Sequence, residues 1–174
     1  VVGVRYSGIG GTRYSLRVNG NVNGDFVNSN DLAFVFDPST PGLSESIING
    51  MNSVLANSEN LAKDYIRQSL GKVAVRNGGE NGYFGNWDIR AAKKIYFSGE
   101  KKSGIELGFD IFNVANLLNK DWGTSKTLGN QNLLTIRNFD PVEKAYVYEV
   151  NPNVGVTTPG GTPYQMQISG KIFF

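Results

Sequence analysis

The sequence of 174 residues contains no cysteine and no histidine. Without cysteine there is no disulfide framework and no thiolate metal site, and without histidine the commonest general base and transition-metal ligand are missing. A Ser-His-Asp arrangement is therefore impossible within these residues, so we expect neither an enzyme nor a bound cofactor. A glycosidase-like pair of carboxylates stays open by residue type, although no spacing singles one out.

Long apolar runs and blocks of one charge are missing as well. No stretch of 18 or more apolar residues occurs, which excludes a transmembrane helix. The 17 basic and 15 acidic residues are scattered along the chain and leave a net charge of +2, so we do not expect nucleic acid as a partner. The first residues carry no signal-peptide pattern, and we interpret them as a strand entered midway, with a larger protein before them.

What the sequence does contain is alternation of apolar and polar residues, which is typical of β-strands because successive side chains point to opposite faces. It predicts strands at about 1–7, 84–98, 104–117 and 162–174. The longer segments run to about 11 residues, the length of a tilted strand that crosses a bilayer, whereas soluble strands average five or six. The alternation by itself fits a soluble β-sandwich equally well, because it does not reveal whether the apolar face meets lipid or protein.

The two faces of these strands predict two different surroundings. In a membrane barrel the apolar face is lipid-facing and the polar face lines the lumen. The expected lipid-facing residues are Trp87, Ile89, Ile105, Leu107, Phe109, Ile111, Met166, Ile168 and Ile172. The expected lumen-lining residues are Asp88, Arg90, Lys94, Glu106, Asp110 and Lys171.

The charges of the polar face are expected to neutralise one another. If Tyr96 pairs with Glu106, then Lys94 lies diagonal to Glu106 and Asp110, and Arg90 lies diagonal to Asp110. A solute path and a structural charge ladder both fit this arrangement. We favour the ladder, because charges of mixed sign are ordinary on polar barrel interiors.

The connections between the predicted strands are very unequal. Segment 98–104 is a short polar turn that joins two antiparallel strands, whereas segments 8–83 and 118–161 are long. Outer-membrane barrels show this contrast between short periplasmic turns and long extracellular loops, which places the C-terminus in the periplasm. Within the long loops we expect helices at 45–55 and 59–70, capped by Ser44 and Ser58 and ended by Gly71, and a hairpin at 133–138 and 145–150.

A weak candidate metal site is the spacing of Asn19, Asn21, Asn23 and Asp25, whose oxygen-bearing side chains lie two residues apart, as in calcium loops. Asparagines replace the usual aspartates and no glutamate closes the loop, so we favour a turn stabilised by the Asn side chains. Aromatic residues of the loops could stack on a sugar or peptide or pack the loops together, and we favour packing. They are Tyr83, Phe84, Trp122, Phe139, Tyr146 and Tyr148.

Several motifs resemble a known family. The segments AVRNGG (74–79), NWDIR (86–90) and LGFDIFNVANLLN (107–119) resemble the closing strands of TonB-dependent outer-membrane receptors, with the closest likeness to the Oar-like and SusC-like branch. Segment 23–35 looks like an extracellular loop of the Oar-like group, and segment 163–174 looks like its last strand. The likeness is weaker at 43–70 and around Pro141.

The resemblance implies an all-β fold, in which residues 1–174 are the C-terminal part of one large antiparallel transmembrane β-barrel domain and the plug domain is absent from this chain. Such a barrel has about 22 strands. It lies in the outer membrane of a Gram-negative bacterium and imports a nutrient such as an oligosaccharide, a peptide or a metal chelate.

The implied partners are the remainder of the barrel and the plug, the lipid bilayer, TonB through the missing N-terminal part, and the barrel-assembly machinery, whose signal falls on Phe174. A surface lipoprotein over the loops is a further candidate partner. Two alternatives stay open: a barrel that serves as a surface adhesion, secretion or assembly component, and a soluble β-rich binding module.

Overall fold

The structure is a computed structural model that describes residues 1–97, 99 and 103–174. The chain is mostly β, with 44% strand and 16% helix, and its sheets are mainly antiparallel, which confirms the predicted class at this level. It divides into two compact units. We call Val1–Gly10, Tyr83–Ser125 and Pro159–Phe174 the sheet unit, and Gly11–Gly82 with Lys126–Thr158 the core unit. Among the described residues, no helix is both long enough and apolar enough to span a membrane.

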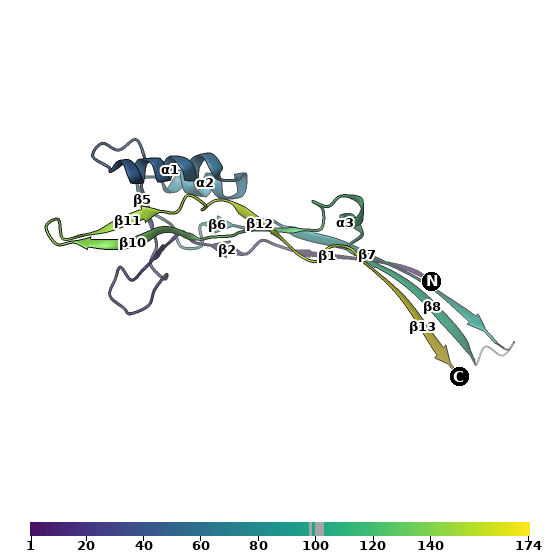
Figure 1. Cartoon of the computed structure of the whole chain (residues 1–174). Coiled ribbons are helices and arrows are strands. Elements are labelled where there is room, and N and C mark those ends of the chain that lie inside the picture. The colour runs from purple at the N-terminus through teal and green to yellow at the C-terminus, as the bar shows by residue number, and fades with distance from the viewer. Residues whose placement is uncertain (98, 100–102) are drawn as a thin grey trace. The chain divides into compact units, whose positions relative to one another are not determined.

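The sheet unit is built on a four-stranded antiparallel sheet in the order β1-β7-β8-β13 (Figure 1). Its strands are β1 (Val2–Ile9), β7 (Phe84–Tyr96), β8 (Gly104–Phe112) and β13 (Gln165–Phe173). Strands β7, β8 and β13 lie within the segments where alternation predicts strands, whereas β1 continues to Ile9, beyond the predicted segment 1–7. Along the described residues, β1 and β13 each keep one edge without a neighbouring strand.

The end of β8 differs from the prediction. We expected this strand to continue to about 117, but it ends at Phe112 and is followed by the short helix α3 (Val114–Leu118). The reason is Asn113, whose φ of 53° lies in the left-handed region and breaks the extended backbone. Asparagine tolerates this region better than most residues, so one residue turns the chain from strand into helix.

The register of β7 and β8 also corrects a prediction. Tyr96 lies opposite Gly104 rather than Glu106, so Lys94 faces Glu106 and Arg90 faces Asp110 directly instead of diagonally. Glycine suits this position, because a side chain on Gly104 would meet the Ile95 carbonyl at 2.3 Å. The expected strand end at 98 and most of the turn 98–104 fall on residues 98 and 100–102, which lie outside the described residues.

The core unit contains two helices and several short sheets. Helix α1 spans Glu45–Asn57 and α2 spans Asn60–Ser69, close to the predicted ranges. A three-stranded sheet pairs β10 (Asn132–Asp140) antiparallel with β11 (Ala145–Val150), the predicted hairpin, and parallel with β3 (Arg17–Asn19). Two-stranded sheets join β2 (Arg13–Tyr14) to β6 (Gly79–Glu80) and β4 (Phe34–Val35) to β5 (Lys72–Val73). A further pair joins β9 (Ser125–Leu128) to β12 (Thr157–Gly160), and each of these two strands has residues in both units as defined above.

The helix caps match the prediction at one position and differ at the other. The Ser44 hydroxyl accepts a hydrogen bond from the Ile47 backbone N–H and caps α1 as expected. Ser58 does not cap α2, because its hydroxyl donates to the Val54 carbonyl and closes the end of α1 instead. Glu59 takes the N-cap position of α2, without a side-chain cap hydrogen bond.

Every buried apolar side chain among the described residues belongs to the core unit. The cluster draws on both long segments that were expected as loops, so 8–83 and 118–161 contribute to one hydrophobic core. Its members are Tyr14, Leu16, Val18, Ala33, Val35, Ile47, Met51, Val54, Ala62, Tyr65, Ile66, Ala74, Leu128, Leu133, Leu134, Val150 and Val154.

Candidate functional site

One face of the four-stranded sheet is apolar and open to its surroundings. The register brings the expected lipid-facing residues into rows across the strands, and Val2, Val4 and Tyr6 of β1 extend the same face. The rows include Ile89–Ile111–Met166, Ala91–Phe109–Ile168 and Ile95–Ile105–Ile172. The exposed fraction is 82% for Ile168 and 61% for Ile172. A continuous exposed apolar surface of this kind marks a site of interaction with lipid or protein.

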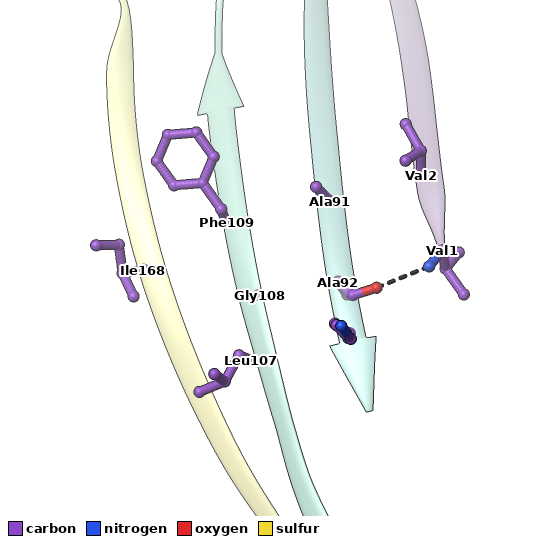
Figure 2. A pocket seen from close by; sticks show the side chains of 9 residues that line it. Val1, Val2, Ala91, Ala92, Leu107, Gly108, Phe109 and Ile168 are labelled. Atoms are coloured by element: carbon purple, nitrogen blue, oxygen red, sulfur yellow. Dashed lines mark hydrogen bonds between the residues drawn. The ribbon is translucent and has the colours of Figure 1, made fainter. Parts of the chain in front are cut away.

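The apolar face has a shallow depression between its larger side chains. Ala91 and Gly108 lie on neighbouring strands, and Val2 and Ile168 lie on the flanking strands (Figure 2). The volume of the depression is about 460 Å³. The small side chain of Ala91 leaves the centre low, Gly108 contributes only backbone there because its side-chain position faces Ser169 and Arg90, and the surrounding Val, Phe and Ile side chains form a rim.

Aromatic residues gather on this face at the other end of the strands. The rings of Tyr6 and Trp87 lie 4.7 Å apart, and the Tyr6 hydroxyl contacts the hydroxyl of Tyr83. Gly8 and Gly85 face each other across β1 and β7, and a side chain on Gly8 would meet the Tyr83 hydroxyl at 2.0 Å. The glycine pair therefore makes room for the two tyrosine rings.

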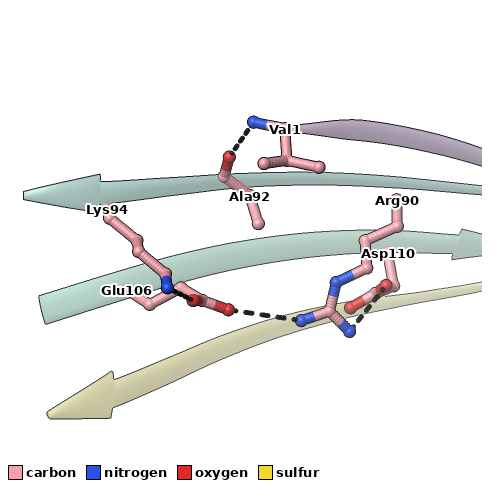
Figure 3. Close-up of polar contacts among 6 residues, drawn as sticks. All are labelled: Val1, Arg90, Ala92, Lys94, Glu106 and Asp110. Atoms are coloured by element: carbon pink, nitrogen blue, oxygen red, sulfur yellow. Dashed lines mark hydrogen bonds and ion pairs between the residues drawn. The ribbon is translucent and has the colours of Figure 1, made fainter. Parts of the chain in front are cut away.

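The opposite face carries a ladder of alternating charges (Figure 3). Arg90 Nη1 lies 3.6 Å from Asp110 Oδ1, and Arg90 Nη2 lies 3.7 Å from Glu106 Oε1. Lys94 Nζ lies 3.7 Å from Glu106 Oε2. The carboxyl-bearing residue Asp110 is buried, with 8% of its surface exposed. The guanidinium thus bridges two carboxylates, an arrangement that lowers the cost of holding them close together.

The remaining polar residues continue the ladder across the sheet. Asp88 Oδ1 accepts a hydrogen bond from the Asn113 backbone N–H at 2.9 Å, which ties the carboxylate to the end of β8. Lys171 of β13 lies opposite Glu106. Arg5 of β1 lies opposite Asp88 and belongs to the same face, although the sequence argument did not single it out. The sequence could have assigned Arg5 to the polar face, because Arg5 alternates with Val4 and Tyr6 of the apolar face.

The two ends of the polar face differ. At the end where β7 and β13 finish, the Phe173 ring lies 5.7 Å from the Tyr96 ring, and Lys94 Nζ lies 5.6 Å from the Phe173 centroid. At the other end a hollow of about 410 Å³ is lined by aromatic, amide and carboxylate side chains. It is bordered by Phe84, Asn86, Asp88, Phe112 and Gln165. Such a lining offers both apolar contact and hydrogen-bonding groups to a solute.

Asn113 holds the segments around this hollow together. Its side-chain Nδ2 donates to the Gly123 carbonyl at 2.8 Å and to the Thr162 carbonyl at 2.9 Å. Gly123 has φ of +60°, and a side chain there would meet Asn113 Oδ1 at 1.8 Å. One asparagine therefore connects the end of β8 with the segments that lead into β9 and β13.

The oxygens of the weak metal candidate are engaged within their own loop. Asn21 Oδ1 accepts from the Gly24 backbone N–H at 2.8 Å, and Asn23 Oδ1 accepts from the Asp25 backbone N–H at 3.0 Å. The Asn19 side-chain oxygen accepts from the Ser29 hydroxyl at 3.3 Å. These contacts are those of a turn stabilised by its asparagines.

Asp25 is the most strongly held of these residues. Its Oδ1 accepts from the Val27 backbone N–H at 2.9 Å, and its Oδ2 accepts from Asn30 Nδ2 at 2.6 Å. The bond from Val27, followed by that from Asn30, lowers the pKa of Asp25. Among the described residues, no group of three or more His, Cys, Asp or Glu side chains lies together as metal ligands would.

The loop aromatics pack mainly on one another. Along the hairpin the rings of Phe139 and Tyr146 lie 5.6 Å apart, those of Tyr146 and Tyr148 lie 6.3 Å apart, and Tyr148 packs against the core. Phe84 borders the hollow on the polar face. Trp122 and Tyr83 are exposed, at 55% and 61%. The aromatic rings of the hairpin therefore pack on one another, whereas the Trp122 side chain is exposed to solvent.

Comparison of the chain with protein-family models, with curated proteins and with solved structures found no match. The family resemblance given above therefore depends on the residues of the motifs themselves.

Proposed function

We propose that the four-stranded sheet is a wall segment of an outer-membrane β-barrel and that the barrel is a TonB-dependent receptor that imports a nutrient. The observation that carries this proposal is the separation of the two faces. Apolar side chains form rows on one face, interrupted at Lys93, and many of them remain exposed, while the other face carries the ladder of Arg90, Glu106 and Asp110. Lipid on one side and a polar interior on the other account for both faces at once.

The open edges of the sheet support a larger barrel. Strands β1 and β13 each have one edge whose backbone N–H and C=O groups lack a neighbouring strand among the described residues. In hydrocarbon, each unsatisfied group costs several kcal/mol, so a sheet in a membrane needs further strands to close it. The remainder of the barrel is thus the first partner of this chain, and the bilayer is the second.

The import role follows from the polar face and from the resemblance. The hollow bordered by Phe84, Asn86 and Asp88 lies on the polar face, on the side of the lumen in a closed barrel. It lies at the end of the sheet that faces outward in the proposed orientation, with the C-terminus in the periplasm. An oligosaccharide, a peptide or a metal chelate would pass this site, and TonB and a plug would act through the part of the protein that precedes these residues. We propose no enzymatic activity.

A second candidate function rests on the core unit. A hairpin with exposed aromatic side chains, Phe139 and Tyr146, stands on a unit that has its own hydrophobic core. A rigid surface of this kind suits a barrel that acts as an adhesion, secretion or assembly component, because aromatic anchors dominate protein contacts. The two candidate functions differ in what they require of the part of the protein that precedes these residues, because only the import receptor needs a plug with a TonB box.

The test begins with the natural polypeptide. We expect its intact mass to exceed 19 kDa by the mass of a plug and further strands, and we expect it to fractionate with the outer membrane and to resist extraction by high salt. Deletion of the TonB-box segment should abolish uptake of the cargo while leaving the barrel in the membrane. A monodisperse monomer of 19 kDa in detergent-free buffer would refute the barrel, and unchanged uptake after the deletion would favour the second candidate.

A further inference from the structure

The depression on the apolar face contains one charged residue. Its lining consists of Val1, Val2, Ala91, Ala92, Lys93, Leu107, Gly108, Phe109 and Ile168. Apart from Lys93, every lining residue is aliphatic, aromatic or glycine. The volume of about 460 Å³ lies within the range of about 300–1,000 Å³ that is typical of ligand pockets. A matching ligand is therefore apolar over most of its surface and anionic at one end.

The place of Lys93 in the sheet indicates where the anionic end of such a ligand would lie. Lys93 lies opposite Leu107, one row before Ile95 and Ile105 at the end of β7. Its flexible stem can run along the apolar surface and bring the ammonium to the end of the strands, where the bilayer meets water. In the proposed orientation this end is periplasmic, so the ammonium reaches the headgroups of the inner leaflet.

We propose that this depression and Lys93 form a binding site for an anionic phospholipid of the inner leaflet, with an acyl chain over Ala91 and Gly108 and the headgroup phosphate at the Lys93 ammonium. The inference rests on the proposed membrane barrel and adds a specific lipid to it. The chemistry explains the cation on an otherwise apolar face, because a lysine near an anionic lipid surface is attracted to the phosphate. It also explains why the small Ala91 lies between the larger Val2 and Phe109.

The neighbouring lysine provides a matched control. Lys93 and Lys94 are adjacent in β7 and point to opposite faces, and Lys94 is paired with Glu106 on the polar face. The full natural polypeptide and its variants would be reconstituted in nanodiscs that contain equal amounts of phosphatidylglycerol and phosphatidylcholine with the same acyl chains. Native mass spectrometry then counts each lipid that stays bound. Heat-modifiable migration in gels shows separately whether each variant has folded as a barrel.

We expect Lys93→Gln to lower the preference for phosphatidylglycerol about fivefold, while Lys94→Gln leaves it unchanged. Ala91→Phe should reduce retention of both lipids by filling the depression while Lys93 keeps its charge. Folded barrels in which Lys93→Gln retains the same lipids as the wild type, or in which Lys94→Gln loses as much, would overturn the lipid site alone. Failure of the wild type to insert into any bilayer would instead overturn the barrel proposal.

Discussion

The two units of this chain deal with their apolar residues in opposite ways. In the core unit, Met51, Ile66 and Leu133 are fully buried by neighbours within the same unit. In the sheet unit, Ile168 and Ile172 keep 82% and 61% of their surface exposed, although the strands around them are regularly paired. Regular hydrogen bonding therefore does not require a protein core. The core unit therefore covers its apolar residues with its own side chains, whereas the apolar face of the sheet unit is left uncovered and meets lipid in the proposed barrel.

The largest effect is expected from a charge placed in the core unit. Ile66 of α2 is fully buried, so Ile66→Asp would leave a carboxylate without water or a partner. We expect destabilisation of the core unit by about 4–5 kcal/mol. Hydrogen exchange of the natural polypeptide should show lost protection in α1, α2 and β10, while the amides of β7 and β8 remain protected.

The matched control is Gln68→Asp, which adds the same charge at an exposed position of α2. Near the C-terminal end of the helix this carboxylate is unfavourable by only about 0.3–1 kcal/mol. Equal loss of protection in both variants would mean that Ile66 is not enclosed as the structure shows. Loss of protection in β7 and β8 would mean that the sheet unit depends on the hydrophobic core of the other unit.

The next effect tests the sheet unit in the same manner. Ile168→Arg places a charge on the apolar face near the middle of β13, and we expect a cost of about 2–4 kcal/mol in a bilayer together with reduced barrel assembly. Gln167→Arg places the same charge on the polar face opposite Asp110 and should be mild. Urea titration in lipid vesicles gives both values. Similar tolerance of the two substitutions would show that the faces are assigned wrongly or that the apolar face does not meet lipid.

The sequence predicted the longer elements of both units, because alternation and helical spacing are local properties, whereas the short strands of the core unit and α3 were not predicted. The four long strands, α1, α2 and the hairpin all lie near their expected positions. The end of β8 was missed, since a single left-handed residue, Asn113, overrides an alternating pattern. The cap at Ser58 was missed because a serine between two helices can serve either one, and only its contact with the Val54 carbonyl decides which.

The candidate site was predicted in composition but not in geometry. Alternation assigned Arg90, Glu106 and Asp110 to one face, yet their contacts depend on a register that the turn sets, and a shift of two residues keeps the faces while changing every partner. The depression around Ala91 and the hollow around Asn86 could not be predicted from the sequence, because both arise from residues that meet only when separate strands pair. The shared core of the core unit was missed for the same reason.

A smaller effect concerns the stability of the core unit at alkaline pH. Burial raises the pKa of Tyr14 to about 12, with a further contribution from nearby Tyr65. Because the pKa of Tyr14 is raised in the folded state, the contribution of its neutral hydroxyl to the stability of the core unit is fully present below the ordinary tyrosine pKa of 10.0 and is lost as the pH rises towards about 12. Ultraviolet difference spectra should therefore show late ionisation of Tyr14, and core-unit protection should fall in that window.

Tyr14→Phe is the control for this titration, because it keeps the ring and removes the hydroxyl, which donates to the Leu61 carbonyl at 3.4 Å. The variant should lose part of the alkaline sensitivity of the core unit, at a cost at neutral pH of about 1 kcal/mol. As the pH rises, the amide protection of the sheet unit should change equally in the wild type and in Tyr14→Phe. A Tyr14 that ionises near 10.0 would show that its ring is reached by water.

The smallest effect belongs to the asparagine-rich loop, which lies in the core unit but outside its hydrophobic core. Hydrogen bonds from the Val27 N–H and from Asn30 lower the pKa of Asp25. The ionised carboxylate therefore supports the loop above the ordinary aspartate pKa of 3.8 and loses this role as the pH falls below it. Phe26 and Ser29 have φ of 66° and 62°, and these left-handed residues depend on such local bonds. Nuclear magnetic resonance should therefore show the signals of residues 21–31 shifting only in strong acid while those of Leu16 and Ile66 stay fixed. Asp25→Asn removes the titration, and a midpoint at or above 3.8 in the wild type would mean that the loop does not hold its carboxylate in this way.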